Sequence, residues 1–199
     1  MGKLDGKKIA ILATDGFEQS ELLEPRKALL AAGAEVEIVS LKADAIRGWK
    51  DADWGENVEV NRTVADASSD AYDGLVLPGG VANPDKLRGD KQAVAFVEGF
   101  VRARKPIAAI CHGPWTLIET GMVMGRKLTS YASLQTDLKN AGAIWVDEEV
   151  VVDNGLVTSR TPDDLPAFNA KMVEEFAEGV HALGKQSGAG KNGQQPAAR

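Results

Sequence analysis

Residues 105–115 constrain the fold of this chain more than any other segment, because a buried strand must turn there directly into a helix. Ile107–Ile110 is a short apolar run without helical periodicity, preceded by a proline and followed closely by a Gly-Pro pair. Pro114 suits the first turn of a helix, where its missing N–H would have had no partner. The segment therefore predicts a buried parallel strand, a sharp corner at Cys111 and a helix.

Cys111 has the sequence surroundings of a nucleophile at such a corner. A tight strand-to-helix turn needs small residues two positions before and after the nucleophile, and Ala109 and Gly113 occupy those positions. A thiol there faces the first N–H groups of the helix, which favours the thiolate. The alternative is that a lone cysteine beside an apolar strand is a small buried hydrophobe. The elbow spacing and the neighbouring His112 favour a nucleophile.

The overall composition is that of a soluble globular protein. The 199 residues are 44% hydrophobic and 26% charged, and the net charge of −6 with no basic stripe argues against nucleic-acid or anionic-membrane partners. The single cysteine excludes an internal disulfide. The charged residues 1–8 lead into an apolar run too short for a signal peptide or membrane span, so we expect a cytoplasmic protein.

Metal and cofactor sites are not predicted. Cys111, His112 and His181 are too few for a four-ligand Cys/His zinc site, and no motif for a carboxylate-rich site is present. The loop after the first strand lacks G-x-G-x-x-G, which disfavours a dinucleotide site. His181 ends the last predicted helix, where interaction with the helix dipole is its expected role.

Alternating strand and helix patterns predict a doubly wound, mostly parallel α/β sheet sandwiched by helices, in a single domain over residues 1–184. Residues 185–199 are predicted to be a disordered tail. Trp49 and Trp54 lie in a polar edge hairpin, where they cover either their own sheet or a partner subunit. The predicted strands are 8–14, 36–41, 73–78, 107–110, 128–131 and 144–146, with a hairpin over 150–158. The predicted helices are one that ends at Gly33, one over 92–104, one after Pro114, one over 134–141 and a last one that starts within 160–164 and reaches Val180.

Two further candidate site features follow predicted strands. Glu18 comes after the first strand and Gly79-Gly80 after the third, and ligands in open α/β sheets bind at the carboxyl ends of strands. Backbone N–H groups of a Gly-Gly loop can approach a substrate or an oxyanion. The alternatives are a solvated first-turn carboxylate for Glu18 and a plain turn for the two glycines.

Four segments resemble the ThiJ/PfpI superfamily, the cysteine-bearing relatives of the class I glutamine amidotransferases. They are Ala-Ile-Cys-His-Gly-Pro at 109–114, residues 9–18, residues 72–80 and residues 127–131. The resemblance covers residues 7–182 and is closest to the PfpI branch, the so-called intracellular proteases. It implies a flavodoxin-like, glutamine-amidotransferase-like fold.

The resemblance also implies roles for individual residues. Cys111 is the nucleophile, His112 the neighbouring imidazole, and Glu18 the glutamate that contacts the nucleophilic sulfur. PfpI-type proteases place a glutamate that completes a triad across a subunit boundary, where this chain offers Asp85, one methylene shorter. The branch forms homodimers that can assemble into hexamers, and we expect a homodimer here.

Three functions from different classes remain open on the sequence. The first is a stress-response enzyme of the deglycase or glyoxalase type, acting on methylglyoxal, glyoxal or glycated protein, with no cofactor. The second is a PfpI-type intracellular cysteine peptidase, and the third a redox sensor or holdase chaperone without turnover. We favour the first, because a thiolate adds to an aldehyde without an oriented general base, whereas peptide hydrolysis needs one.

Overall fold

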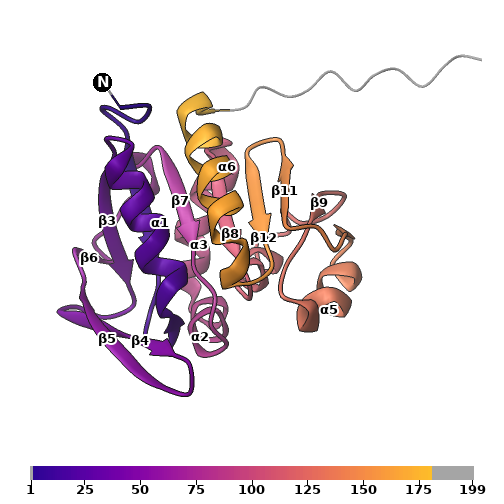
Figure 1. Cartoon of the computed structure of the whole chain (residues 1–199), viewed down its shortest axis with the longest axis horizontal. Coiled ribbons are helices and arrows are strands. Elements are labelled where there is room, and N and C mark those ends of the chain that lie inside the picture. The colour runs from indigo at the N-terminus through magenta and orange to yellow at the C-terminus, as the bar shows by residue number, and fades with distance from the viewer. Residues whose placement is uncertain (1, 181–199) are drawn as a thin grey trace, which may run out of the picture.

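The structure, a computed structural model, describes residues 2–180, and these form a seven-stranded sheet between two layers of helices (Figure 1). Neighbouring strands of this sheet pair in parallel, except β11 (Val150–Asp153) and β12 (Leu156–Ser159), which pair antiparallel. The predicted fold class is thereby confirmed. The order is β11 (Val150–Asp153), β12 (Leu156–Ser159), β8 (Ile107–Ile110), β7 (Gly74–Leu77), β1 (Lys8–Leu12), β3 (Glu35–Ser40) and β6 (Arg62–Thr63).

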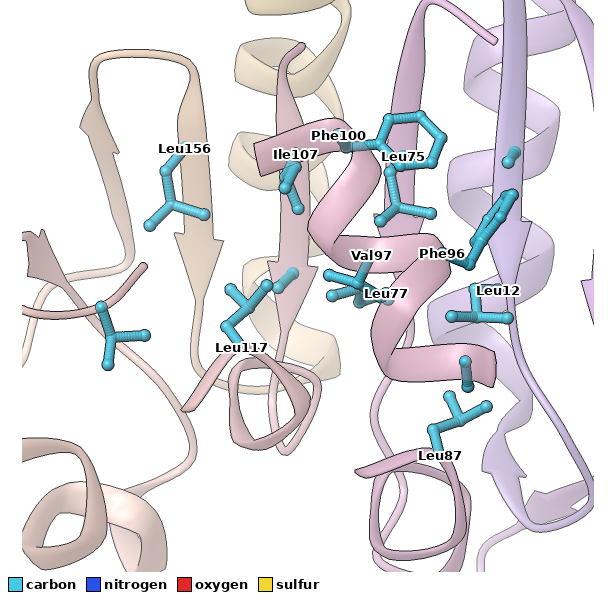
Figure 2. Close-up of a cluster of buried hydrophobic side chains, with 14 of the residues drawn as sticks. Leu12, Leu75, Leu77, Leu87, Phe96, Val97, Phe100, Ile107, Leu117 and Leu156 are labelled. Atoms are coloured by element: carbon cyan, nitrogen blue, oxygen red, sulfur yellow. The ribbon is translucent and has the colours of Figure 1, made fainter. Parts of the chain in front are cut away.

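The two helical layers cover opposite faces of the sheet. Helices α1 (Gln19–Ala31) and α6 (Leu165–Glu178) pack on each other along one face, the near side of Figure 1. The other face carries α3 (Lys91–Ala103), accompanied by α2 (Ala82–Gly89), α4 (Pro114–Ile118) and α5 (Gln135–Asn140), whose buried leucines belong to the same apolar cluster. Figure 2 shows α3 lying across β8, β7 and β1, with Phe96, Val97 and Phe100 directed at the sheet.

Each central strand divides its side chains between the two faces, because successive residues of a strand point in opposite directions. In β1, Ile9 and Ile11 join the cluster beneath α1 and α6, while Ala10 and Leu12 join the cluster beneath α3. Both faces are apolar, as expected for a parallel sheet covered on both sides. Because both faces of each central strand are buried, these strands read as continuous apolar runs in the sequence.

The tryptophan hairpin does not extend the main sheet. Strands β4 (Ala45–Lys50) and β5 (Asp53–Glu59) form a separate three-stranded sheet with the two-residue β2 (Phe17–Glu18). Trp49 and Trp54 face each other across the hairpin in an edge-to-face pair with ring centroids 5.5 Å apart, and are 37% and 45% exposed. The expected hairpin is confirmed, but its place at the edge of the main sheet is wrong. Coverage by a partner subunit stays a prediction.

The C-terminal hairpin forms at Asn154 and Gly155, which both have positive φ, at 44° and 80°. Such angles suit a tight turn between antiparallel strands and explain the Asn-Gly signal. The remaining short elements are β9 (Lys127–Leu128), β10 (Ile144–Trp145) and the 3-10 turns η1 (Ser69–Ala71), η2 (Ala132–Leu134) and η3 (Pro162–Asp164).

The segment after β9 leaves its strand early and runs to the corner at Cys111. Thr129 donates its N–H to the Thr158 hydroxyl at 3.0 Å, and Tyr131 donates its N–H to the Cys111 carbonyl at 2.8 Å. The predicted strand over 128–131 is therefore shorter than expected, because its last residues bond to the main sheet and the elbow.

Some predictions fall on residues outside the described range 2–180. These are the dipole role of His181 and the tail over 185–199, and the domain boundary at 184 stays a prediction. Within the described range, no helix combines the length and apolar character needed to span a membrane.

Candidate active site

The predicted strand-to-helix corner is present, and Cys111 occupies it with a left-handed backbone at φ 60°. A non-glycine residue pays a strain cost of about 1–3 kcal/mol in such a conformation, so the surrounding structure must hold it. Cys111 donates its N–H to the Ser159 carbonyl at 3.0 Å, and Gly113 donates to the Ile110 carbonyl at 2.8 Å. A Cβ at Gly113 would lie 2.3 Å from the Leu77 carbonyl oxygen, so only glycine fits there.

The carboxyl group that faces the Cys111 sulfur belongs to Glu21, so the assignment of that role to Glu18 is corrected. The Glu21 side chain is fully buried in the first turn of α1, and its Oε2 accepts the Gly79 N–H at 2.9 Å. Its Oε1 is buried without a conventional hydrogen-bond partner among the described residues. Glu18 precedes α1, accepts a bond from the Ser20 hydroxyl at 3.3 Å and lines a surface pocket.

A pattern in the sequence could have identified Glu21. With Pro25 and Leu29 it occupies positions i, i+4 and i+8, which share one face of a helix, and all three are buried. A carboxyl group within an apolar stripe must be paired, neutral or functional. The family resemblance indicates Glu18 in the loop before α1, whereas the helical period indicates Glu21, which lies about one turn further along the chain.

The buried position of Glu21 changes its acidity. Burial, with a smaller contribution from the nearby charge of Glu18, raises the pKa of Glu21 to about 8, against the opposing effect of the Gly79 N–H. The carboxyl group therefore holds its proton at neutral pH. In that state it is a hydrogen-bond donor beside the sulfur.

The sulfur of Cys111 is also removed from solvent, since the residue is 7% exposed. Burial raises the pKa of the thiol, and an ionised Glu21 raises it further, whereas the N–H groups of Gly80 and His112 lower it. The helix that follows has only five residues, so its start does not outweigh burial. Burial therefore opposes the thiolate that the sequence predicts, and a standing thiolate at Cys111 stays a prediction.

His112 provides a proton acceptor beside the sulfur. Its Nδ1 lies 3.2 Å from the Cys111 sulfur, although neighbouring side chains at a corner usually diverge, and the positive φ of Cys111 accompanies this geometry. The ring stacks on Tyr131 with centroids 4.7 Å apart, and its Nε2 lies 3.3 Å from the Ser133 hydroxyl. Burial lowers the pKa of His112, so the imidazole is neutral at neutral pH.

The two loop glycines have different places in the site. The Gly79 N–H is bonded to Glu21, so the structure places it as a holder of that carboxyl and not as an oxyanion donor. The Gly80 N–H is directed at the Cys111 sulfur, and the φ of 77° at Gly80 requires glycine. Gly80 is therefore the remaining candidate of the pair for contact with substrate.

Asp85 lies away from this cluster within the described chain. It is exposed in the first turn of α2, and the nitrogen of His112 that a triad carboxylate would orient faces Ser133. Pairing of Asp85 with His112 across a subunit boundary stays a prediction. Among residues 2–180, no three or more His, Cys, Asp or Glu side chains are grouped to hold a metal ion.

Comparison with known proteins identifies relatives of this chain. The Escherichia coli (strain K12) protein/nucleic acid deglycase 2 is 46% identical, over 84% of this chain and 96% of that protein. Bacillus subtilis (strain 168) YraA, which bears a provisional name as a cysteine protease, is 45% identical over the same shares. The crystal structure of Drosophila melanogaster DJ-1beta superposes with a TM-score of 0.78 at 29% identity, covering 86% of this chain and 90% of that one. Residues 7–175 match the DJ-1/PfpI family, and the chain belongs to that family.

Proposed function

We propose that this protein is a cysteine-dependent enzyme that acts on reactive carbonyls, namely methylglyoxal, glyoxal or their early adducts on protein. The observation that carries the proposal is the pairing of a proton donor and a proton acceptor on one sulfur. Glu21, protonated at neutral pH, faces Cys111 from one side, and the neutral His112 lies 3.2 Å away on another. The relative named as a deglycase supports the same substrate class.

The first chemical step is addition of the thiol to the aldehyde. The Cys111 S–H bond breaks as its proton passes to Nδ1 of His112, and the sulfur bonds to the aldehyde carbon. The carbonyl electron pair moves to the oxygen, which takes that proton from His112 and gives a hemithioacetal, so the imidazole is neutral again. During this transfer the protonated Glu21 carboxyl stabilises the charge that grows on the sulfur.

The later steps return the free enzyme. For methylglyoxal, the proton on the former aldehyde carbon moves to the neighbouring carbon, with His112 as carrier, and leaves a thioester on Cys111. Water then cleaves the C–S bond and releases a 2-hydroxy acid and the thiol. The net reaction is oxoaldehyde plus water to hydroxy acid, so no external oxidant or reductant is consumed.

A peptidase is the second candidate, supported by the relative YraA. Amide hydrolysis needs an oriented base and a donor for the amine leaving group. Within the described chain the distal nitrogen of His112 faces the neutral hydroxyl of Ser133, and Asp85 is exposed elsewhere. This arrangement suits an electrophile that is already reactive. A homodimer that brings Asp85 to His112 would strengthen the peptidase alternative.

The substitution Cys111→Ser tests the proposal directly. We expect it to reduce methylglyoxal turnover by roughly a thousandfold or more, because it removes the nucleophile. The assay must follow formation of the hydroxy acid, since buffer amines scavenge free aldehyde and imitate turnover. Cys111-dependent peptide cleavage without methylglyoxal turnover would favour the peptidase. Absence of both activities would favour the redox-sensor or chaperone function.

The pH dependence gives a second test. Turnover is expected to fall above about pH 8, because Glu21 then loses the proton that it donates to the sulfur. Glutamine keeps an N–H donor at that position and does not titrate, so Glu21→Gln should remove the alkaline decline. Measuring kcat/KM from pH 6 to pH 10 for both proteins decides the point. An unchanged decline in Glu21→Gln would show that another group causes it.

A further inference from the structure

The loop at residues 78–80 supplies two N–H groups to the active site. The Gly79 N–H donates to Oε2 of Glu21 at 2.9 Å, and the Gly80 N–H is directed at the Cys111 sulfur. The loop lies directly against the elbow, because a Cβ added at Gly79 would come within 2.7 Å of Cβ of Cys111. The direction of these two N–H groups is therefore part of the environment of the nucleophile.

Asn83, in the first turn of α2, is fully buried and makes three hydrogen bonds through its carboxamide group. Its Oδ1 accepts the Thr14 N–H at 2.8 Å, and its Nδ2 donates to the carbonyls of Pro78 at 3.0 Å and Gly79 at 3.2 Å. An amide nitrogen carries two protons, so each carbonyl can take one. The bond from Thr14 fixes which way the amide faces, and its nitrogen is left facing the loop.

The planarity of the peptide bond links these two carbonyls to the N–H groups that enter the site. In a trans peptide bond the C=O and the N–H of one unit point in opposite directions, and both bonds here are trans. The Pro78 carbonyl shares its peptide unit with the Gly79 N–H, and the Gly79 carbonyl shares its unit with the Gly80 N–H. A donor that holds the two carbonyls therefore also directs the two N–H groups.

The loop needs such a donor because its two glycines do little to fix their own conformation. Glycine adopts positive and negative φ with similar ease, so the peptide unit between two glycines can turn over at low cost. Gly80 has a φ of 77°, and its N–H would point away from the sulfur if that unit turned over. The Glu18 N–H also donates to the Gly79 carbonyl, at a longer 3.3 Å. The buried Asn83 side chain opposes the same rotation with a second bond.

We propose that Asn83 is a positioning residue that aims the Gly79 N–H at Glu21 and the Gly80 N–H at the Cys111 sulfur by holding the carbonyls on the opposite side of the loop. Its three hydrogen bonds all go to backbone groups, so it acts on the nucleophile through the loop. An N–H group aimed at the sulfur lowers the pKa of the Cys111 thiol, so losing that aim raises it. The inference rests on the proposed function only for the use of the nucleophile in turnover.

The pH profile of Cys111 alkylation by iodoacetamide tests this role without any carbonyl substrate, and the single cysteine makes the reaction specific. We expect Asn83→Ala to move the midpoint of the profile up by about one pH unit, the effect of weakening one hydrogen bond to a charged group. Asn83→Asp keeps the acceptor for the Thr14 N–H, which preserves the tie to β1, but cannot supply both donors. It should move the midpoint in the same direction.

Asn61→Asp is the matched control for these variants. Asn61 is exposed, and its Oδ1 accepts the Ile38 N–H at 2.7 Å, a bond that aspartate keeps. The substitution adds the same charge as Asn83→Asp without touching the loop. We expect its alkylation midpoint to match that of the wild type.

NMR of the Gly80 amide adds a measurement that a merely structural role of Asn83, or the charge of an added aspartate, would not change. In the wild type the Gly80 amide signal should follow the ionisation of Cys111, and in Asn83→Ala and Asn83→Asp this response should be lost. An unchanged midpoint in both variants, or a Gly80 signal that still responds as in the wild type, would overturn the proposal. A shifted midpoint with no carbonyl turnover by the wild type would leave the role of Asn83 standing and refute the proposed function.

Discussion

Replacing Gly79 by alanine is expected to lower activity by roughly a hundredfold or more and to destabilise the fold by about 2–3 kcal/mol. A Cβ at this position would lie 2.4 Å from Oε2 of Glu21, 2.7 Å from Cβ of Cys111 and 2.9 Å from the backbone nitrogen of His112. These are backbone or buried atoms that hold the nucleophile, so they cannot yield without displacing it. Both turnover and Cys111 alkylation should fall, and thermal unfolding measures the loss of stability.

Gly89→Ala is the matched control for this prediction. Gly89 ends α2, its φ is not positive, and a Cβ there meets no atom within 4 Å. We expect this variant to match the wild type in turnover and to be unchanged or slightly more stable, because alanine has less conformational freedom to lose. Normal alkylation and turnover in Gly79→Ala would contradict the packing described around Cys111.

The substitution Glu21→Gln is expected to change the pH dependence of stability. The pKa of Glu21 is about 8 in the folded protein against an ordinary value of 4.5, so the folded state binds a proton that the unfolded state releases. The contribution of this bound proton to the free energy of unfolding is fully present below pH 4.5 and is lost as the pH rises towards about 8. Between pH 5 and pH 7 the free energy of unfolding of the wild type should fall by about 3 kcal/mol relative to Glu21→Gln.

Denaturant unfolding at several pH values measures this difference. Glu24→Gln, in the same helix but at an exposed position, is the matched control and should follow the wild type within about 0.5 kcal/mol. Parallel pH curves for wild type and Glu21→Gln would mean that Glu21 is ionised in the fold at neutral pH. That result would also remove the donor on which the proposed chemistry depends.

The sequence by itself determined the features that depend on neighbouring residues. The strand Ile107–Ile110 and the helix starting at Pro114 were predicted because a proline, a glycine and an apolar run act locally. The turn at Asn154 and Gly155 follows from the ease with which these residues adopt positive φ. The parallel sheet follows from the alternation of such elements, because parallel strands need crossover connections.

Only the tertiary structure decided which groups meet at Cys111. Glu21 bonds to Gly79 across 58 positions of sequence, and Ser133 reaches His112 across 21, so no local pattern could pair them. The acidity of Glu21 and Cys111 depends on how completely the surrounding layers exclude water, which is a property of packing. The sequence located the nucleophile, but the groups that control its proton are set by contacts between distant segments.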